Sequence, residues 1–176
     1  MSQLFGPAKQ LGYVVRDIEA AMRHWTQAMH IGPFYYVSRV PVVALCYHGV
    51  ESNPELSVAF AYSGDVQIEL IQQHDDTAST YRAFVDAGHE GLHHIGFLSE
   101  RFDRDLRRAD EAGLEVAQSA LVGGPDGKET FFAPGGHAGT ILKLIALHDG
   151  NRGLYRMVRT EAQRWDGSGP IRRIEL

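Results

Sequence analysis

The chain has 176 residues, 44% of them hydrophobic and 22% charged, and a formal net charge of -5 from 17 basic and 22 acidic residues. These values are typical of a soluble globular domain that is large enough to fold without disulfides. The acidic balance, without a basic stripe that carries interleaved aromatic residues, argues against nucleic acid as a partner. No apolar run approaches the roughly 18 residues that a membrane span requires, so no membrane association is expected.

The cysteine content and the N-terminus predict the compartment. Cys46 is the single cysteine and cannot form an internal disulfide, and no apolar signal segment opens the chain. Both observations favour a reduced, cytoplasmic setting. Because Cys46 lies in the apolar run 42–47, a buried small hydrophobic residue is favoured over a nucleophile.

The first half of the chain predicts one strand, one long helix and then several strands. The strand spans 9–15, Asp17 is a helix N-cap candidate, and apolar residues recur at helical spacing to about His30. Further strands are expected at 34–37, 42–48, 56–62 and 66–72, with an extra hairpin around Asn53, and a short helix at 81–87.

The second half repeats this order. A strand at 92–98 and a helix at 101–112 precede strands at 114–122, 129–133 and 139–147. A last helix at 151–164 is expected to present one apolar side, made of Leu154, Met157, Val158 and Ala162. The tail from Asp166 is broken by Gly and Pro, so it is expected to pack loosely or to reach a partner.

Two segments of the chain match two others. Gln10-Leu11-Gly12-Tyr13-Val14 corresponds to His94-Ile95-Gly96-Phe97-Leu98, and 66–71 corresponds to 140–145. Four polar residues therefore occupy equivalent places: Gln10, Glu69, His94 and Lys143. If the two copies pack around a pseudo-two-fold axis, these side chains meet. A period this long is not a solenoid and favours an α+β fold of paired modules.

These segments resemble the vicinal oxygen chelate superfamily of glyoxalases, bleomycin-resistance proteins and extradiol dioxygenases. The closest resemblance is to glyoxalase-like or methylmalonyl-CoA epimerase-like members, and it covers about 9–147. It rests on 11–21, 67–71, 91–97, Pro134-Gly135-Gly136 and 140–145. The resemblance implies one domain over 1–176, with two tandem βαβββ modules, about 9–88 and about 91–147, and a C-terminal helix and tail at 150–176. The modules are expected to form a curled mixed sheet around a central cleft, and a homodimer is implied.

The resemblance also implies a divalent metal at the places of Gln10, Glu69, His94 and Lys143. The family commonly has His at the first place and Glu at the last, so this chain departs at both. An ammonium has no lone pair and cannot bind a metal. At about 4 Å and an effective dielectric near 20, a unit charge pair interacts by about 4 kcal/mol, and twice that for a divalent ion. We hypothesise that the Lys143 ammonium takes the metal's place and pairs with Glu69.

The cofactor is accordingly none, or a divalent ion (Mg, Mn, Co, Zn or Ni) at an open site with three protein ligands, Gln10, Glu69 and His94. Extradiol ring cleavage is disfavoured, because iron requires two His and a carboxylate with open positions.

Glu69, Lys143 and His94 are the candidate catalytic residues. Glu69 lies in an apolar run, where a carboxylate must be paired; the sequence favours a general base over a surface position. Lys143 either stabilises an oxyanion or extends to the rim of the cleft. His94 is a second acid/base, a metal ligand or a hydrogen-bonded core residue. His93 is expected to face the opposite side of the strand and to be structural or to lie at an interface.

A second set of residues is predicted to bind substrate. Gln67 precedes Glu69 by two residues and shares its face of the strand. Aromatic residues of the first half are candidate pocket walls, although most such residues are core. The full set is Gln10, Gln67, Tyr36, Tyr47 and Tyr62. His137 and His148 are candidates for the cleft mouth, although histidines in surface loops are the commoner case.

The predicted function is a small-molecule enzyme, an isomerase or epimerase, or a lyase. It would act through an enolate-like intermediate on a hydrophobic substrate that contains a carbonyl group, and a coenzyme A thioester is one option. The alternative is a metal-free protein that binds and sequesters a small molecule without catalysis.

Overall fold

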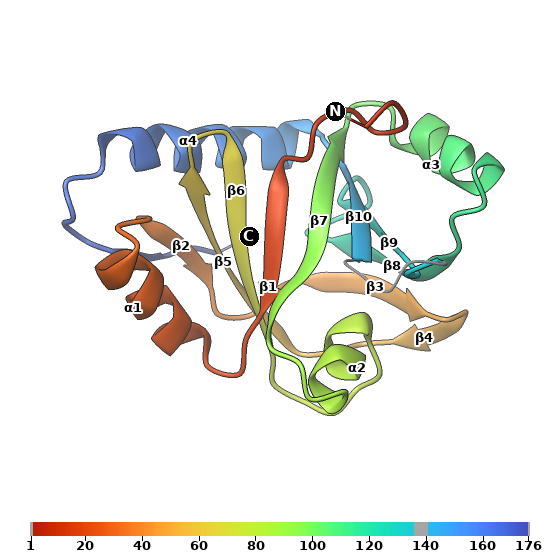
Figure 1. Cartoon of the computed structure of the whole chain (residues 1–176), viewed down its shortest axis with the longest axis horizontal. Coiled ribbons are helices and arrows are strands. Elements are labelled where there is room, and N and C mark those ends of the chain that lie inside the picture. The colour runs from red at the N-terminus through yellow and green to blue at the C-terminus, as the bar shows by residue number, and fades with distance from the viewer. Residues whose placement is uncertain (1, 136–140, 176) are drawn as a thin grey trace.

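The computed structural model describes residues 2–135 and 141–175, which form an α+β fold (Figure 1). The helices are α1 (Ile18–Ala28), α2 (Thr80–Asp86), α3 (Phe102–Glu111) and α4 (Asp149–Arg164). The strands are β1 (Gln10–Val14), β2 (Phe34–Val37), β3 (Val42–Tyr47), β4 (Val50–Ser52), β5 (Leu56–Ser63), β6 (Val66–Gln73), β7 (Gly91–Ser99), β8 (Val116–Val122), β9 (Lys128–Phe132), β10 (Ile141–Ala146) and β11 (Ile171–Arg173).

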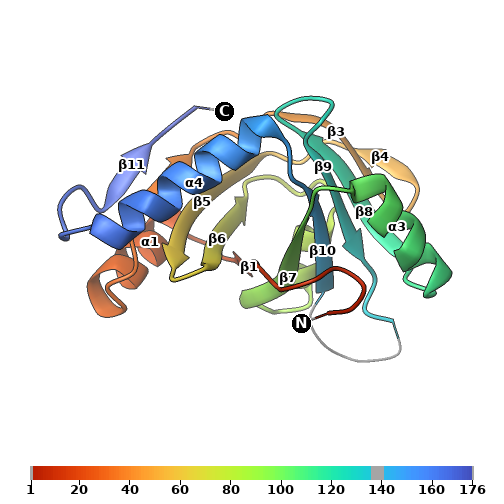
Figure 2. The ribbon, with the colours of Figure 1, turned by 90° about the horizontal axis from the view of Figure 1, so that it is seen from above.

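The strands join one mixed sheet in the order β11-β2-β5-β6-β1-β7-β10-β9-β8-β3-β4. The order β1-β6-β5-β2 in one half mirrors the order β7-β10-β9-β8 in the other. β1 and β7 pair antiparallel at the centre, and each pairs parallel with the last strand of its own half, β6 or β10. The sheet curls without closing, which confirms the predicted fold class (Figure 2).

The hairpin expected around Asn53 lies elsewhere. β3 and β4 are joined by His48 and Gly49, whose φ values of 47° and 81° suit the tight turn that matches strand twist. This hairpin leaves the first half of the sheet and pairs with β8 in the second half. The chain between β2 and β3 therefore crosses the open side of the curl, where Val40 N donates to Leu56 O.

The helices cover the sheet largely as the sequence indicates. The Asp17 side chain caps α1 by accepting a hydrogen bond from Ala20 N, and Ile18 and Met22 are buried. In α4, Val158 is fully buried, but Met157 is 38% exposed, so its predicted place on the apolar side is wrong. No helix in the described part of the chain is long and apolar enough to cross a membrane.

The tail after α4 is ordered, which corrects the expectation of loose packing. β11 pairs parallel with β2, with Ile171 opposite Phe34. The Trp165 ring lies against Gly32, and Arg172 binds both Glu161 and the Tyr35 hydroxyl. The tail thus extends the first half of the sheet at its outer edge.

β1 and β7 approach closely because each carries a glycine opposite a polar side chain of the other. Gly12 pairs with His94, and Gly96 pairs with Gln10. A Cβ on Gly12 would lie 1.9 Å from His94 Cε1, and one on Gly96 would lie 2.7 Å from Gln10 Oε1. Each glycine therefore provides the space for the polar side chain of the neighbouring strand.

Replacing Gly12 with Ala is expected to lower the free energy of unfolding by about 1–3 kcal/mol or more, because the added methyl group overpacks a buried ring. Urea denaturation measures the change. The matched control is Gly153→Ala on exposed α4, where a Cβ meets nothing within 4 Å. That change is expected to stabilise by about 0.5–1 kcal/mol. If both variants change stability equally, the close approach does not constrain Gly12.

Candidate active site

The four polar side chains at equivalent strand positions meet on the concave face of the sheet. Each is at most 4% exposed. Lys143 Nζ lies 3.3 Å from Glu69 Oε2, and His94 Nε2 lies 3.1 Å from the same oxygen. His94 Nε2 is also 3.1 Å from the Gln10 amide oxygen. The carboxylate of Glu69 is thus shared by an ammonium and an imidazole.

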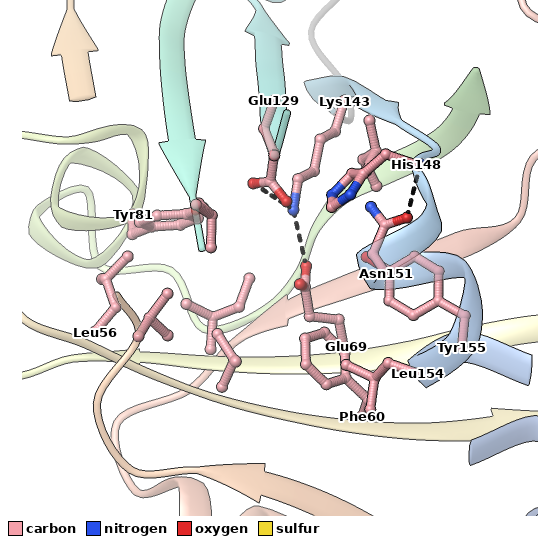
Figure 3. A pocket seen from close by; sticks show the side chains of 16 residues that line it. Leu56, Phe60, Glu69, Tyr81, Glu129, Lys143, His148, Asn151, Leu154 and Tyr155 are labelled. Atoms are coloured by element: carbon pink, nitrogen blue, oxygen red, sulfur yellow. Dashed lines mark hydrogen bonds and ion pairs between the residues drawn. The ribbon is translucent and has the colours of Figure 1, made fainter. Parts of the chain in front are cut away.

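Glu129 on β9 adds a second carboxylate that the sequence analysis did not single out. Its Oε2 lies 3.1 Å from Lys143 Nζ, so the ammonium is held between two carboxylates (Figure 3). By strand pairing, Glu129 opposes Ile145 on β10, as Val58 opposes Ile71 in the first half. The residue equivalent to Glu129 in the first half is thus the apolar Val58, and the repeat does not point to Glu129. The sequence feature that could have identified it is a Glu at an inward position of the predicted strand 129–133.

Lys143 remains charged in this setting. Burial alone lowers the pKa of its ammonium, but the charges of Glu129 and Glu69 outweigh burial and raise the pKa above its usual value. Burial raises the pKa of Glu129, assisted by the Glu69 charge and opposed by Lys143. The site therefore combines a permanent cation with a carboxyl group that holds a proton more readily than usual.

His93 does not face the opposite side of the sheet, so that prediction is wrong. The register between β1 and β7 shifts after Gly12, which leaves His93 as an additional residue on β7. Such a bulge redirects a side chain. The rings of His93 and His94 both contact Phe131, at centroid distances of 6.2 and 5.3 Å.

The two imidazoles are neutral and contact each other. Burial lowers the pKa of His93 to about 3, and burial with the Lys143 charge lowers that of His94 well below its usual value. His94 Nε2 faces only acceptors and must carry a proton, so its Nδ1 is an acceptor. His93 lies 3.1 Å from that nitrogen through its Nδ1 and 3.2 Å from the Thr80 carbonyl oxygen through its Nε2, and the neutral ring has one proton to donate to one of these two partners.

Gln10 is oriented by Gln67, and neither lines the cavity described below. The Gln10 amide donates to Gln67 Oε1 at 2.7 Å, and the Gln67 amide donates to the Tyr62 hydroxyl at 3.3 Å. Burial raises the pKa of Tyr62 to about 12, so its phenol stays neutral. These three predicted substrate-binding residues instead form a support behind His94.

Tyr36 and Tyr47 lie away from the site. Tyr36 packs in the core beneath α1, and Tyr47 stacks edge-on against His48 at the hairpin. Within the described part of the chain, the cavity lining includes neither, which corrects their prediction as walls; Phe60, Tyr81 and Tyr155 take that place. His137 lies outside the described residues.

A cavity of about 80 Å³ opens onto the charged centre. Glu69, Glu129 and Lys143 line one part of it, and apolar side chains line most of the rest (Figure 3). The N-terminal part of α4 covers one end with His148, Asn151, Leu154 and Tyr155, and α2 contributes Tyr81. Burial raises the pKa of Tyr81 and Tyr155 well above the usual value, so both remain phenols.

Comparison with known families decides the identity of this arrangement. Residues 9–132 match the profile of the Glyoxalase/Bleomycin resistance protein/Dioxygenase superfamily. The chain belongs to this superfamily. No curated protein matches the chain at a significant level.

Several solved structures share the superfamily fold with the chain. Methylmalonyl-CoA epimerase from Mycobacterium tuberculosis is 14% identical, with a TM-score of 0.61 over 87% of this chain and 95% of that one. A hypothetical protein from Bacillus halodurans C-125 is 16% identical, with a TM-score of 0.59 over 81% and 95%. A methylmalonyl-CoA epimerase in complex with methylmalonyl-CoA and NH4+ is 15% identical, with a TM-score of 0.53 over 81% and 94%. At these identities the likeness shows the fold.

Superfamily members often use a divalent metal, but the residues at this centre do not suit one. The Lys143 ammonium lies in contact with Glu69 and Glu129 and repels a divalent cation from both carboxylates. His94 directs its Nε2 proton, not a lone pair, between Gln10 and Glu69. Among residues 2–135 and 141–175, no three His, Cys, Asp or Glu side chains are grouped as metal ligands.

Replacing Lys143 with Met removes the charge and keeps the length of the side chain. Because two buried carboxylates lose their partner, the free energy of unfolding at pH 7 is expected to fall by about 3–5 kcal/mol. The loss is expected to shrink at lower pH, where the carboxylates can take up protons. Urea denaturation at several pH values measures both effects.

The matched control is Lys128→Met, which breaks the exposed ion pair of Lys128 with Asp103. Exposed pairs contribute about 1 kcal/mol or less, so this loss is expected to be small. Equal losses in the two variants would contradict a buried ammonium that holds two carboxylates together.

The neutral imidazoles also predict a pH dependence of stability. The folded pKa of His93 is about 3, below its usual 6.5, so the unfolded chain takes up a proton first as the pH falls. The contribution of neutral His93 to the free energy of unfolding is present above pH 6.5. It is lost as the pH falls towards 3, by up to about 1.4 kcal/mol per pH unit. Replacing His93 with Asn is expected to reduce this slope between pH 6 and 4.5. An unchanged slope would show that His93 is protonated in the folded protein.

Proposed function

We propose that this protein is an isomerase or epimerase that removes and returns a proton on the carbon next to a carbonyl group. The observation that carries the proposal is the buried ammonium held between two carboxylates at the edge of an apolar cavity. Such a centre offers a base, an acid and an oxyanion partner within two hydrogen-bond lengths of one another. The apolar lining supports a compact hydrophobic substrate.

Lys143 supplies the charge that an enolate requires. Its ammonium has three N–H donors, of which Glu69 and Glu129 engage two. The third is available to the carbonyl oxygen of a bound substrate. As negative charge develops on that oxygen, the fixed cation stabilises it in a site from which water is largely excluded.

The two carboxyl groups divide the proton transfers. Glu69 takes the proton from the carbon, the C–H electron pair forms the carbon–carbon double bond, and the carbonyl π pair moves to oxygen. Glu129, whose pKa is raised by burial, returns a proton to the carbon and restores the carbonyl. Exchange with water then resets the two groups.

His94 supports Glu69 in this scheme. His94 directs its Nε2 proton at Glu69 Oε2, 3.1 Å away, so it holds the carboxylate in place and stabilises the basic form that accepts the substrate proton. In this proposal the tethered ammonium takes the part that a divalent ion plays in other members, and no metal is required.

We infer in addition a homodimer, which the family resemblance implies, and a cytoplasmic setting, which the single cysteine favours. Val43 and Val50 on the β3–β4 hairpin are 63% and 69% exposed and supply apolar surface for such a contact. Light scattering of the purified protein measures the assembly.

Replacing Glu69 with Gln is expected to lower the rate at which solvent deuterium exchanges into a bound carbonyl compound by at least about a hundredfold. The reason is that general-base catalysis is lost. The probe is a panel of compact α-substituted ketones and acids, with methylmalonyl-CoA included, followed by proton NMR in D2O. The wild-type protein identifies the members that exchange. Binding of those members to the variant is expected to persist, since Gln keeps the shape of the side chain.

Glu129→Gln provides the comparison. This variant is expected to slow the return of the proton and hence the interconversion of isomers. If neither variant alters exchange, or if the wild-type protein binds panel members but exchanges none of them, the protein is a binder of small molecules and the enzymatic proposal fails.

A further inference from the structure

His148 separates the buried cavity from an open hollow on the surface. It lines the cavity beside Lys143 and Glu129, and it also lines a hollow of about 300 Å³. Arg101, Asp126 and Lys128 form part of the wall of that hollow. In the part of the chain that the structure describes, His148 is the one residue common to the two linings. Figure 3 shows its ring directed into the cavity, towards the Lys143 ammonium.

The cavity must open before a substrate can bind. Its volume of about 80 Å³ is well below the roughly 300–1,000 Å³ of typical small-molecule pockets. A carbonyl compound with an apolar substituent requires more space and a path from solvent. Of the charged side chains, Glu129 is the most exposed at 16%, against 2% for Lys143 and 5% for Glu69. The path therefore approaches the charged centre from the side of Glu129.

The other walls of the cavity are held by backbone hydrogen bonds. Glu129 also borders a groove beneath α3, but that groove is lined by Lys128 and Thr130, whose side chains alternate with Glu129 along β9. The sheet separates this groove from the cavity, and a passage between them would require breaking the hydrogen bonds between two strands. On the open side of the curl, Val40 is bonded to Leu56 and Pro41 to Gly123 through the main chain.

The His148 side chain is held at the start of α4 mainly through the backbone around it. The His148 amide donates to Asn151 Oδ1 at 3.0 Å, and Asn151 Nδ2 donates to the Ala146 carbonyl at 2.8 Å. These bonds fix the start of α4 through the main chain of His148. The His148 side chain also faces the Asn151 amide as the other half of a capping box, so rotation of the ring gives up that one contact. The ring lies over Gly150, where a Cβ would come within 2.9 Å of His148 Cε1. The bare glycine provides the room that the ring uses.

We propose that His148 is the gate of the cavity and selects substrates by size. Rotation of its ring joins the surface hollow to the charged centre, so a substrate enters with its carbonyl group first. This inference rests on the proposed function for the meaning of the cavity, but the opening itself is testable without a substrate.

The test places a cysteine inside the cavity and measures how fast reagents reach it. Cys46 is first replaced with Ser, and Val58, a buried wall residue on β5, is replaced with Cys. Methyl methanethiosulfonate and the larger 5,5′-dithiobis(2-nitrobenzoate) are the probes. Adding His148→Ala is expected to accelerate labelling by the larger reagent at least tenfold and the smaller one less. His148→Trp is expected to slow both.

Val40→Ala, on the opposite wall, is the matched control and is expected to leave both rates unchanged once they are corrected for global stability. Urea denaturation of each variant gives that correction, because labelling through global unfolding does not depend on reagent size. If Val40→Ala accelerates labelling and His148→Ala does not, the entrance lies at the β2–β3 crossing and the proposal is overturned. Equal rates in all variants overturn it too.

The labelling assay also separates this inference from the proposed function. Glu69→Gln in the same background is expected to label at the rate of its parent, since Glu69 lies beyond the gate. Labelling that follows His148 while no carbonyl compound exchanges deuterium supports the gate and refutes the isomerase. If carbonyl compounds exchange deuterium but the labelling rate does not depend on His148, the isomerase is supported and the gate is refuted.

Discussion

The structure depends on one buried ammonium that must be neutralised. Removing a charge from water costs several kcal/mol, so Lys143 is tolerated at 1% exposure only because carboxylates from β6 and β9 reach it. That requirement fixes the register of three strands from both halves of the sheet. Two carboxylates against one ammonium leave an excess negative charge. Burial raises the pKa of Glu129 and the Glu69 charge adds to that rise, whereas burial and the Lys143 charge keep the two imidazoles neutral.

The internal repeat explains how much of this centre the sequence could predict. Gln10 and His94 are equivalent, as are Glu69 and Lys143, because strand alternation and pairing place them symmetrically about the β1–β7 contact. Each of the latter two even has a Phe as its cross-strand neighbour, Phe60 or Phe131. A symmetric sheet that carries opposite charges at equivalent positions brings those charges together. Sequence comparison alone therefore finds the pair.

Features that break the symmetry could not be found in this way. Glu129 has an apolar counterpart, Val58, so the repeat gives no signal for it. The position of His93 depends on a bulge, which strict alternation cannot anticipate. The pairing of β3 with β8 and of β11 with β2 joins segments that lie far apart in sequence. The β3–β4 turn uses His48 at positive φ, where Asn or Asp is the usual signal.

The region that matches the superfamily and the helix that follows it differ in what they contribute to the site. Residues 9–132 match the superfamily and include Glu69, His94 and Glu129, the groups to which the proposed function gives the proton transfers and their support, whereas α4 follows that region and covers one end of the cavity. Chemistry at the centre needs fixed geometry, because the acid, base and cation must hold their spacing within fractions of an ångström. Entry of a substrate into the cavity instead needs mobility, which a side chain at the end of a helix can supply at low energetic cost. A helix placed after the last strand of the repeat can change in length and sequence without altering strand register. Differences in substrate size between superfamily members are therefore best sought in such additions, and differences in reaction type in the strand positions that face the charged centre.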